Sequence, residues 1–141
     1  MTKKLIALLL ALACVLSLAA CGKKDSGAAD KVELPVADGA VIGTGATAIT
    51  VEVQGADGKS VTFTVNTDEE TVGAALLKLG VIAGEDSDYG LYVKTVNGET
   101  ADWDKDQAWW CLTDATGEMT TVGVADIALH DGDSYAFVYT K

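Results

Sequence analysis

The stretch TAITVEVQGADGKSVTFTVNTDEETVGAALLKLG, residues 47–80, decides the fold because two strand patterns are followed there by one helix pattern. Apolar and polar residues alternate over residues 49–53 and again over residues 61–65, as in strands with one buried face. Between them lies Asp57-Gly58, a strong hairpin signal because glycine accepts positive φ angles. The sequence therefore predicts an N-terminal antiparallel β-hairpin.

The second part of this stretch predicts an amphipathic helix. Thr67 to Glu70 fit a capping box, with Thr67 as the N-cap and Glu70 reaching back to it. Gly80 stands where a glycine commonly ends a helix. One apolar stripe at helical spacing faces the core and consists of Val72, Ala75, Leu76 and Leu79.

Three further strand patterns follow the helix: YGLYVKTVNG, AWWCL and, near the end, SYAFVY. Strand patterns that come before and after one helix in the sequence indicate an α+β domain, in which the helix packs on a mixed β-sheet. We therefore expect a β-grasp-like fold that begins with the hairpin.

The first residues predict export and a lipid anchor. Lys3 and Lys4 precede an apolar run that is short for a membrane span, and Ala19-Ala20-Cys21 ends it. A cysteine after small residues resembles the lipobox of bacterial lipoproteins, in which that cysteine is acylated and becomes the new N-terminus. The resemblance implies a signal peptide over residues 1–20, a lipidated Cys21 and an extracytoplasmic protein anchored to the bacterial cell membrane. An ordinary signal peptide followed by an unrelated cysteine is the alternative.

The rest of the chain predicts a tethered acidic domain. Residues 21–45 are rich in Gly, Ala, Asp and Lys without a sustained period, so we expect the lipidated cysteine and a flexible tether there, and the domain over residues 46–141. With Cys14 in the signal peptide and Cys21 lipidated, Cys111 has no partner for an internal disulfide. Without the two signal lysines, eight lysines face 21 acidic residues, a net charge of −13, which argues against nucleic acid as a partner.

The stretch ADWDKDQAWWCLTD, residues 101–114, invites a metal interpretation that its spacing does not support. An EF-hand loop that starts at Asp102 requires glycine at its sixth position and glutamate at its twelfth, but Gln107 and Thr113 stand there. The chain has one histidine and no CxxC, HExxH or nucleophile motif. We therefore expect an acidic turn before a strand, no metal site, no required cofactor, no catalytic residues and no enzyme activity.

The aromatic residues are the better candidates for a site. Trp109 and Trp110 are neighbours, so on a strand they face opposite sides of the sheet. One can fill the core, and the other then lies on the outer face, in a pocket or under a loop. The alternative is that both are covered, one by the helix and one by the loops. An exposed indole would offer a platform for ligand stacking.

From Thr71 onward the chain resembles the transcobalamin-like C-terminal domain, the β-domain of transcobalamin and intrinsic factor. This domain also occurs alone in bacterial surface lipoproteins. The resemblance rests on the order and spacing of TVGAALLKLGV, YGLYVKTVNG, AWWCL, GVADIALHDGD and YAFVY. It implies a β-grasp-like fold, and in the vertebrate members this domain covers one face of cobalamin while a helical barrel holds the other.

Carried over by position, the resemblance implies contacts to a corrinoid from Trp110, Cys111 and Leu112, with Tyr89, Gly90, Leu91, Tyr92 and Val93 nearby. Glutamine usually stands at the position of Cys111 in the vertebrate members. The leading hypothesis is a non-enzymatic, monomeric surface lipoprotein that binds cobalamin or another corrinoid, as a capture component for uptake. The alternative is a protein-interaction or adhesion module of the same fold, with a surface protein or a glycan as its partner.

Overall fold

The N-terminal hairpin is present in the structure, a computed structural model that describes residues 31–141. Strand β2 (Thr47–Gln54) pairs antiparallel with β3 (Ser60–Thr67) over their whole length. Gly58 takes a φ of +79° in the turn between them. The inward side chains of both strands are buried, as the alternation predicts.

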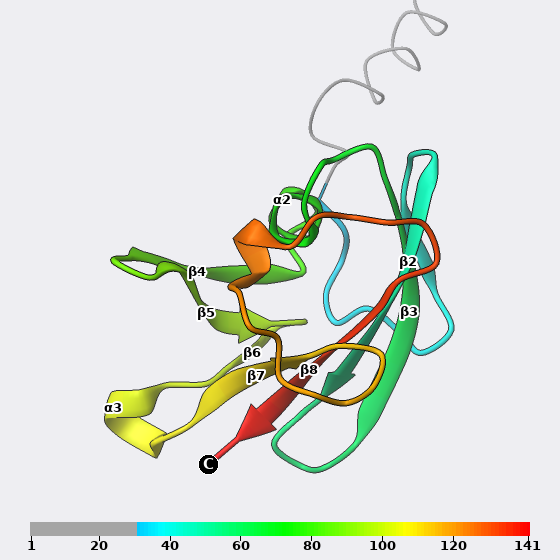
Figure 1. Cartoon of the computed structure of the whole chain (residues 1–141). Helices are drawn as coiled ribbons and strands as arrows, with labels where there is room; N and C mark the ends of the chain where they lie inside the picture. Colours follow the sequence, from blue (N-terminus) through cyan, green and yellow to red (C-terminus); the bar gives the residue numbers. More distant parts are fainter. Residues whose placement is uncertain (1–30) are drawn as a thin grey trace, which may run out of the picture.

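Five strands form a mixed sheet in the order β1-β3-β2-β8-β7 (Figure 1). Its remaining strands are β1 (Val41–Gly43), β7 (Trp109–Thr113) and β8 (Ser134–Thr140). The first strand of the hairpin, β2, runs parallel to the last strand, β8, in the middle of the sheet. On one side of this central pair, β3 runs antiparallel to β2, and on the other side β7 runs antiparallel to β8. This is the α+β, β-grasp-like arrangement that the sequence predicts.

Helix α2 (Val72–Leu79) lies beside the five-stranded sheet, but the predicted N-cap is wrong (Figure 1). Thr71 is the N-cap, and its hydroxyl oxygen accepts a hydrogen bond from the N–H of Ala74 at 3.2 Å. Thr67 is instead the last residue of β3, where it pairs with Thr47. Sheet pairing thus extends the strand past the start of the capping-box motif. The helix ends at Gly80 as predicted, with a φ of +77°.

A second sheet of three antiparallel strands was not predicted as a separate unit. It consists of β4 (Ile82–Ser87), β5 (Gly90–Val96) and β6 (Glu99–Thr100), and it projects to one side of the main sheet (Figure 1). Only the first residue of β4 is buried, so the strand lacks the alternation that reveals strands in a sequence. It pairs with β5 through a bulge at Ala83/Gly84. A side chain at Gly84 would collide with the carbonyl oxygen of Tyr92.

The predicted tether is wrong from about residue 32 onward. Val32 donates its N–H to the carbonyl of Leu79 at 2.9 Å, and Val36 is 4% exposed. The N–H of Val36 donates to the side-chain oxygen of Asn97 at 2.6 Å, and β1 joins the sheet beside β3. The folded domain therefore begins well before residue 46. The predicted signal peptide, Cys21 and the first part of the tether lie outside the described residues.

One apolar core connects the two sheets and the helix. It includes the stripe of α2, the inner faces of β2, β3 and β8, and Ile82 and Val96 of the small sheet. Two short helices complete the described part, α3 (Trp103–Asp106) and η2 (Val124–Asp126). Within residues 31–141, no helix has both the length and the apolar character that a membrane crossing requires.

Candidate functional site

An apolar groove lies where the small sheet meets the free edge of the large one. Strand β5 and strand β7 are in contact there, and the segment from Thr120 to Val124 closes the third side. The cavity measures about 170 Å³. Its lining contains no charged residue and consists of Leu91, Tyr92, Val93, Trp109, Trp110, Leu112, Thr120, Val122, Gly123, Val124 and Phe137.

Trp110 anchors the floor of the groove. It is 6% exposed, and its indole N–H donates to the carbonyl oxygen of Lys94 on β5 at 3.1 Å. Its ring meets the ring of Tyr139 edge to face, with centroids 5.4 Å apart and planes at 88°. One side chain of β7 is therefore tied both to its own sheet and to the small sheet. Trp110 is the tryptophan that enters the core, whereas Trp109 is half-buried.

The third wall is held by hydrogen bonds of a turn and of the returning backbone. Asp114 begins a tight turn after β7, and its carboxylate accepts from the N–H and the hydroxyl of Thr116. These hydrogen bonds, the hydroxyl of Thr116 first, lower the pKa of Asp114. The chain then returns to β7, and Thr120 donates its N–H to the carbonyl of Leu112 at 3.0 Å. Val122 is left on the rim with half of its surface exposed.

The structure brings together five of the eight residues predicted to contact a ligand. Leu91, Tyr92 and Val93 come from β5, and Trp110 and Leu112 come from β7. These two strands are separated by a turn, a short strand and α3, so only the fold makes them neighbours. Tyr92 stands at the rim, 38% exposed.

The other three predicted residues do not line the groove. Cys111 alternates with Trp110 and Leu112 along β7, which turns its side chain to the other face of the sheet. Partial burial raises the pKa of the Cys111 thiol. Tyr89 lies in the turn between β4 and β5 and is 95% exposed, while Gly90 starts β5 with a φ of +100°.

Sequence reasoning missed five of the 11 lining residues as candidate site residues, and it left Trp109 open as one of two candidates for an exposed indole. Phe137 reaches the groove because β8 pairs with β7 and places it opposite Leu112. The other missed residues are Thr120, Val122, Gly123 and Val124. The two valines around Gly123 were the available signal, but the position of exposed Val122 and buried Val124 beside β5 depends on the return of the loop.

The acidic stretch before β7 forms the short helix α3, with Asp102 as its N-cap. The carboxylate of Asp102 accepts from the N–H groups of Asp104 and Lys105, and α3 ends at Gln107 with a φ of +51°. The predicted acidic turn before a strand is therefore present, as a short helix. Among residues 31–141, no three Asp, Glu, His or Cys side chains are grouped so that they would hold a metal ion.

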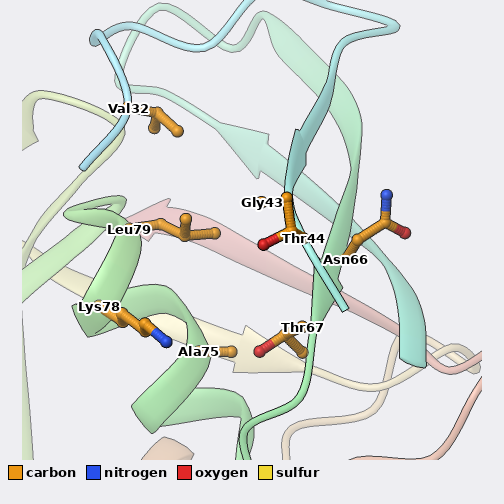
Figure 2. A pocket seen from close by; sticks show the side chains of 8 residues that line it. All are labelled: Val32, Gly43, Thr44, Asn66, Thr67, Ala75, Lys78 and Leu79. Atoms are coloured by element: carbon orange, nitrogen blue, oxygen red, sulfur yellow. The ribbon is translucent and has the colours of Figure 1, made fainter. Parts of the chain in front are cut away.

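A second hollow of about 150 Å³ lies between α2 and the turn from β1 to β2 (Figure 2). It is more polar than the groove, with Lys78 and Thr67 on its walls. Thr67 is 5% exposed and accepts from the N–H of Glu69, and the Lys78 ammonium pairs with the Glu69 carboxylate at 3.1 Å. The other lining residues are Val32, Gly43, Thr44, Asn66, Ala75 and Leu79. The sequence predicted no site here because part of this hollow fell in the expected tether.

Comparison with protein-family models gives no match, and comparison with curated proteins gives none either. Solved structures do match. Haptocorrin in complex with Cbi aligns with a TM-score of 0.52 and 18% identity, over 67% of this chain and 25% of that one. At this identity the match shows the shared fold, and the chain spans about a quarter of haptocorrin.

A stronger match is a candidate metal-binding protein from Ruminococcus gnavus ATCC 29149, with a crystal structure at 1.30 Å resolution. It aligns with a TM-score of 0.64 and 33% identity, over 68% of this chain and 98% of that one. An identity at this level over nearly the whole of the other chain shows common descent, and the chain belongs to the same family as this Ruminococcus gnavus protein.

Proposed function

We propose that this protein is a non-enzymatic, lipid-anchored binding protein of the bacterial cell surface, and that its apolar groove holds part of a corrinoid such as cobalamin. The observation that carries the proposal is the groove itself. Its lining is uncharged, aromatic at its floor and open at one side, and its polar groups include the hydroxyls of Thr120 and Tyr92. Such a combination is typical of sites for small organic molecules.

The position of the groove supports a corrinoid in particular. The segments that resemble the transcobalamin-like domain, YGLYV and WWCL, are the ones that form its two strand walls. The aligned part of haptocorrin shares the fold, and that protein was crystallised with Cbi. The name of the Ruminococcus gnavus protein suggests a metal ligand, and a corrinoid is itself a metal complex.

The size of the groove limits how the ligand is held. A cavity of about 170 Å³ is smaller than the roughly 300–1,000 Å³ of ordinary ligand pockets. It therefore takes an edge or a side group of a corrinoid and leaves the rest uncovered. We expect weak binding by this chain alone, and tight binding only with a partner on the other face of the ligand.

Anchoring belongs to the same proposal. Acylation of Cys21 would hold the mature chain on the outer side of the membrane, about ten residues before the described domain begins. Capture beside an uptake transporter is the role that this location suggests. Metabolic labelling with a fatty-acid analogue tests it, because Cys21→Ser should abolish the label and release the protein from the membrane.

The ligand is tested by calorimetric titration of residues 22–141, which contain the whole described domain, with cyanocobalamin. The critical variant is Val122→Asp, which places a carboxylate at the rim on a side chain that is already 50% exposed. Val41→Asp is the matched control, because Val41 is 65% exposed on β1, at the opposite edge of the large sheet. We expect at least a tenfold loss of affinity for the first variant and no change for the second.

A flat titration of the unmodified domain at millimolar cobalamin would contradict the corrinoid proposal. It would favour the alternative, a protein-interaction module, for which the structure offers one specific observation. Large apolar side chains are exposed on the surface of the domain, among them Tyr89, Trp103 and Met119 at 95%, 57% and 62% exposure. Equal loss of binding in both valine variants would show that the groove is not the site.

A further inference from the structure

We infer that the groove selects ligands with a positive charge on an apolar or aromatic body. The inference rests on the proposed function and adds the charge class of the ligand. It starts from a contrast between the lining, which has no charged residue, and the chain around it. Residues 81–126, which supply all of the lining except Phe137, hold ten acidic residues and two lysines. The acidic ones are Glu85, Asp86, Asp88, Glu99, Asp102, Asp104, Asp106, Asp114, Glu118 and Asp126.

The two lysines of this segment do not offset that charge for a ligand, because each faces a carboxylate. The Lys94 ammonium lies 3.2 Å from the Glu85 carboxylate, and the Lys105 ammonium lies 4.0 Å from that of Asp102. Eight acidic residues of the segment have no lysine within ion-pair distance in the described part of the chain. One of them, Asp86, is the cross-strand neighbour of the lining residue Leu91, so a ligand that approaches the groove meets negative charge beside it.

The negative charge also acts on Tyr139, which packs against the groove floor. Tyr139 stacks edge to face on Trp110, and its pKa is raised by burial first and then by the charges of Asp106 and Glu99. The pKa of Tyr135 is raised by burial and then by Asp133, with a further contribution from Asp114. Carboxylates on α3, β6 and the turn after β7 thus act on the same side of the sheet.

A cation gains twice from this arrangement. The surrounding carboxylates attract it over several ångströms at moderate salt, and an aromatic ring in the lining, such as that of Trp110, favours a cation electrostatically. A neutral ligand of the same shape keeps only the apolar contacts, and an anion is repelled. The groove therefore discriminates by charge, although no charged side chain lines it.

Aquocobalamin and cyanocobalamin provide a matched pair of probes, because they differ in the upper axial ligand and the first carries a net positive charge. We expect aquocobalamin to bind the unmodified residues 22–141 several times more tightly at low ionic strength, by calorimetry at one fixed pH. The difference should vanish near 1 M salt, where the Debye length is about 3 Å. Direct coordination of the cobalt by a side chain would survive the salt.

Two charge-neutralising variants identify the source of the selectivity. Asp106→Asn and Glu99→Gln should each weaken aquocobalamin about twofold at low salt and leave cyanocobalamin unchanged. Glutamine keeps an oxygen for the N–H of Ala56, which the Glu99 carboxylate accepts at 3.1 Å. Glu52→Gln is the control, because Glu52 alternates with buried Val51 and Val53 and faces the other side of the sheet.

The outcomes separate this inference from the proposed function. Equal affinities for the two cobalamins at low salt would overturn the charge selectivity and leave the corrinoid proposal standing. Tighter aquocobalamin binding that resists salt, or that Glu52→Gln weakens as much as Asp106→Asn, would also overturn it. Absence of binding for both cobalamins would overturn the proposed function, and the selectivity with it.

Discussion

The two sheets of this domain are stabilised in different ways. The five-stranded sheet buries a complete apolar face of its own, with Ile49, Val51, Phe63, Val65 and Phe137 all at 1% exposure or less. The three-stranded sheet has no such face. Strand β4 is exposed from its second residue onward, and only Ile82 and Val96 of this sheet are almost fully buried. A small antiparallel sheet without a buried face is not stable alone, so it depends on its contacts with the large one.

The candidate groove lies at this junction. Trp110 reaches across it with the hydrogen bond to Lys94, while Leu91 and Val93 line the groove from the small sheet. Free energies of local opening differ within a domain and are lowest where few apolar contacts are buried. The candidate groove therefore lies where the structure opens most easily, and the polar hollow beside α2 lies on the more stable side.

Trp110→Ala should produce the largest effect and should act mainly on the small sheet. Removal of a buried tryptophan typically costs about 3–5 kcal/mol, a large part of the stability of a small domain. The lost indole also leaves the carbonyl of Lys94 without its 3.1 Å partner. Hydrogen exchange of the folded variant should be much faster in β5, with a smaller change in β2 and β3.

Trp110→Phe is the control for this prediction, because it keeps an aromatic ring beside Tyr139 but has no N–H donor. We expect it to cost less than the alanine variant and to leave β5 more protected. Uniform acceleration of exchange in all strands of Trp110→Ala would contradict the comparison of the two sheets. This variant is also unsuitable as a ligand test, since lost binding would be confounded by loss of structure.

A smaller effect is expected on the stable side, at the start of α2. Thr71→Ala removes the acceptor for the N–H of Ala74 and should lower the free energy of unfolding by about 1 kcal/mol. Glu70→Gln should change it little, because the capping box that included Glu70 does not form. Denaturant unfolding of both variants measures the difference. A larger loss for Glu70→Gln than for Thr71→Ala would favour the original capping-box prediction.

Much of the stable side was predictable because its signals are local. The alternation in residues 49–65, the Asp57-Gly58 turn and the stripe of α2 each determine one element within a few residues. The N-cap was misplaced because β3 pairs with β2 through Thr67, and sheet pairing is a tertiary contact that no local pattern contains. Val36 was assigned to a tether for a similar reason, since its partner Asn97 is 61 residues away.

The candidate site was predictable in part, and mainly through resemblance. Trp110 and Leu112 alternate on one strand, so the pattern could place both on one face. The contribution of Phe137 needed the register of β7 against β8, and that of Val122 needed the return of the loop to Leu112. Cys111 was carried over by position, although the alternation of β7 turns it away from the groove.

The smallest predicted effect is electrostatic and lies at the junction itself. The raised pKa of Tyr139 means that the folded state keeps this proton to a higher pH than the unfolded state. Its contribution to stability is therefore complete below the ordinary tyrosine pKa of about 10 and is lost as the pH rises through the folded value. Asp106→Asn removes one of the two negative charges and should lower the pKa of Tyr139, but burial still keeps it above the ordinary value.

The ultraviolet absorbance of tyrosinate follows this titration, and Tyr139→Phe assigns the step that belongs to this residue while it keeps a ring against Trp110. Neutralisation of the same carboxylate is expected to weaken aquocobalamin binding. The two measurements therefore examine the electric field of Asp106 with and without a ligand. If Asp106→Asn left the titration of Tyr139 unchanged, the charge of α3 would not reach the residue that packs against Trp110, and the charge selectivity would lose its physical basis. If the titration shifted but ligand affinity did not, the charge of Asp106 would act on Tyr139 and not on the bound ligand.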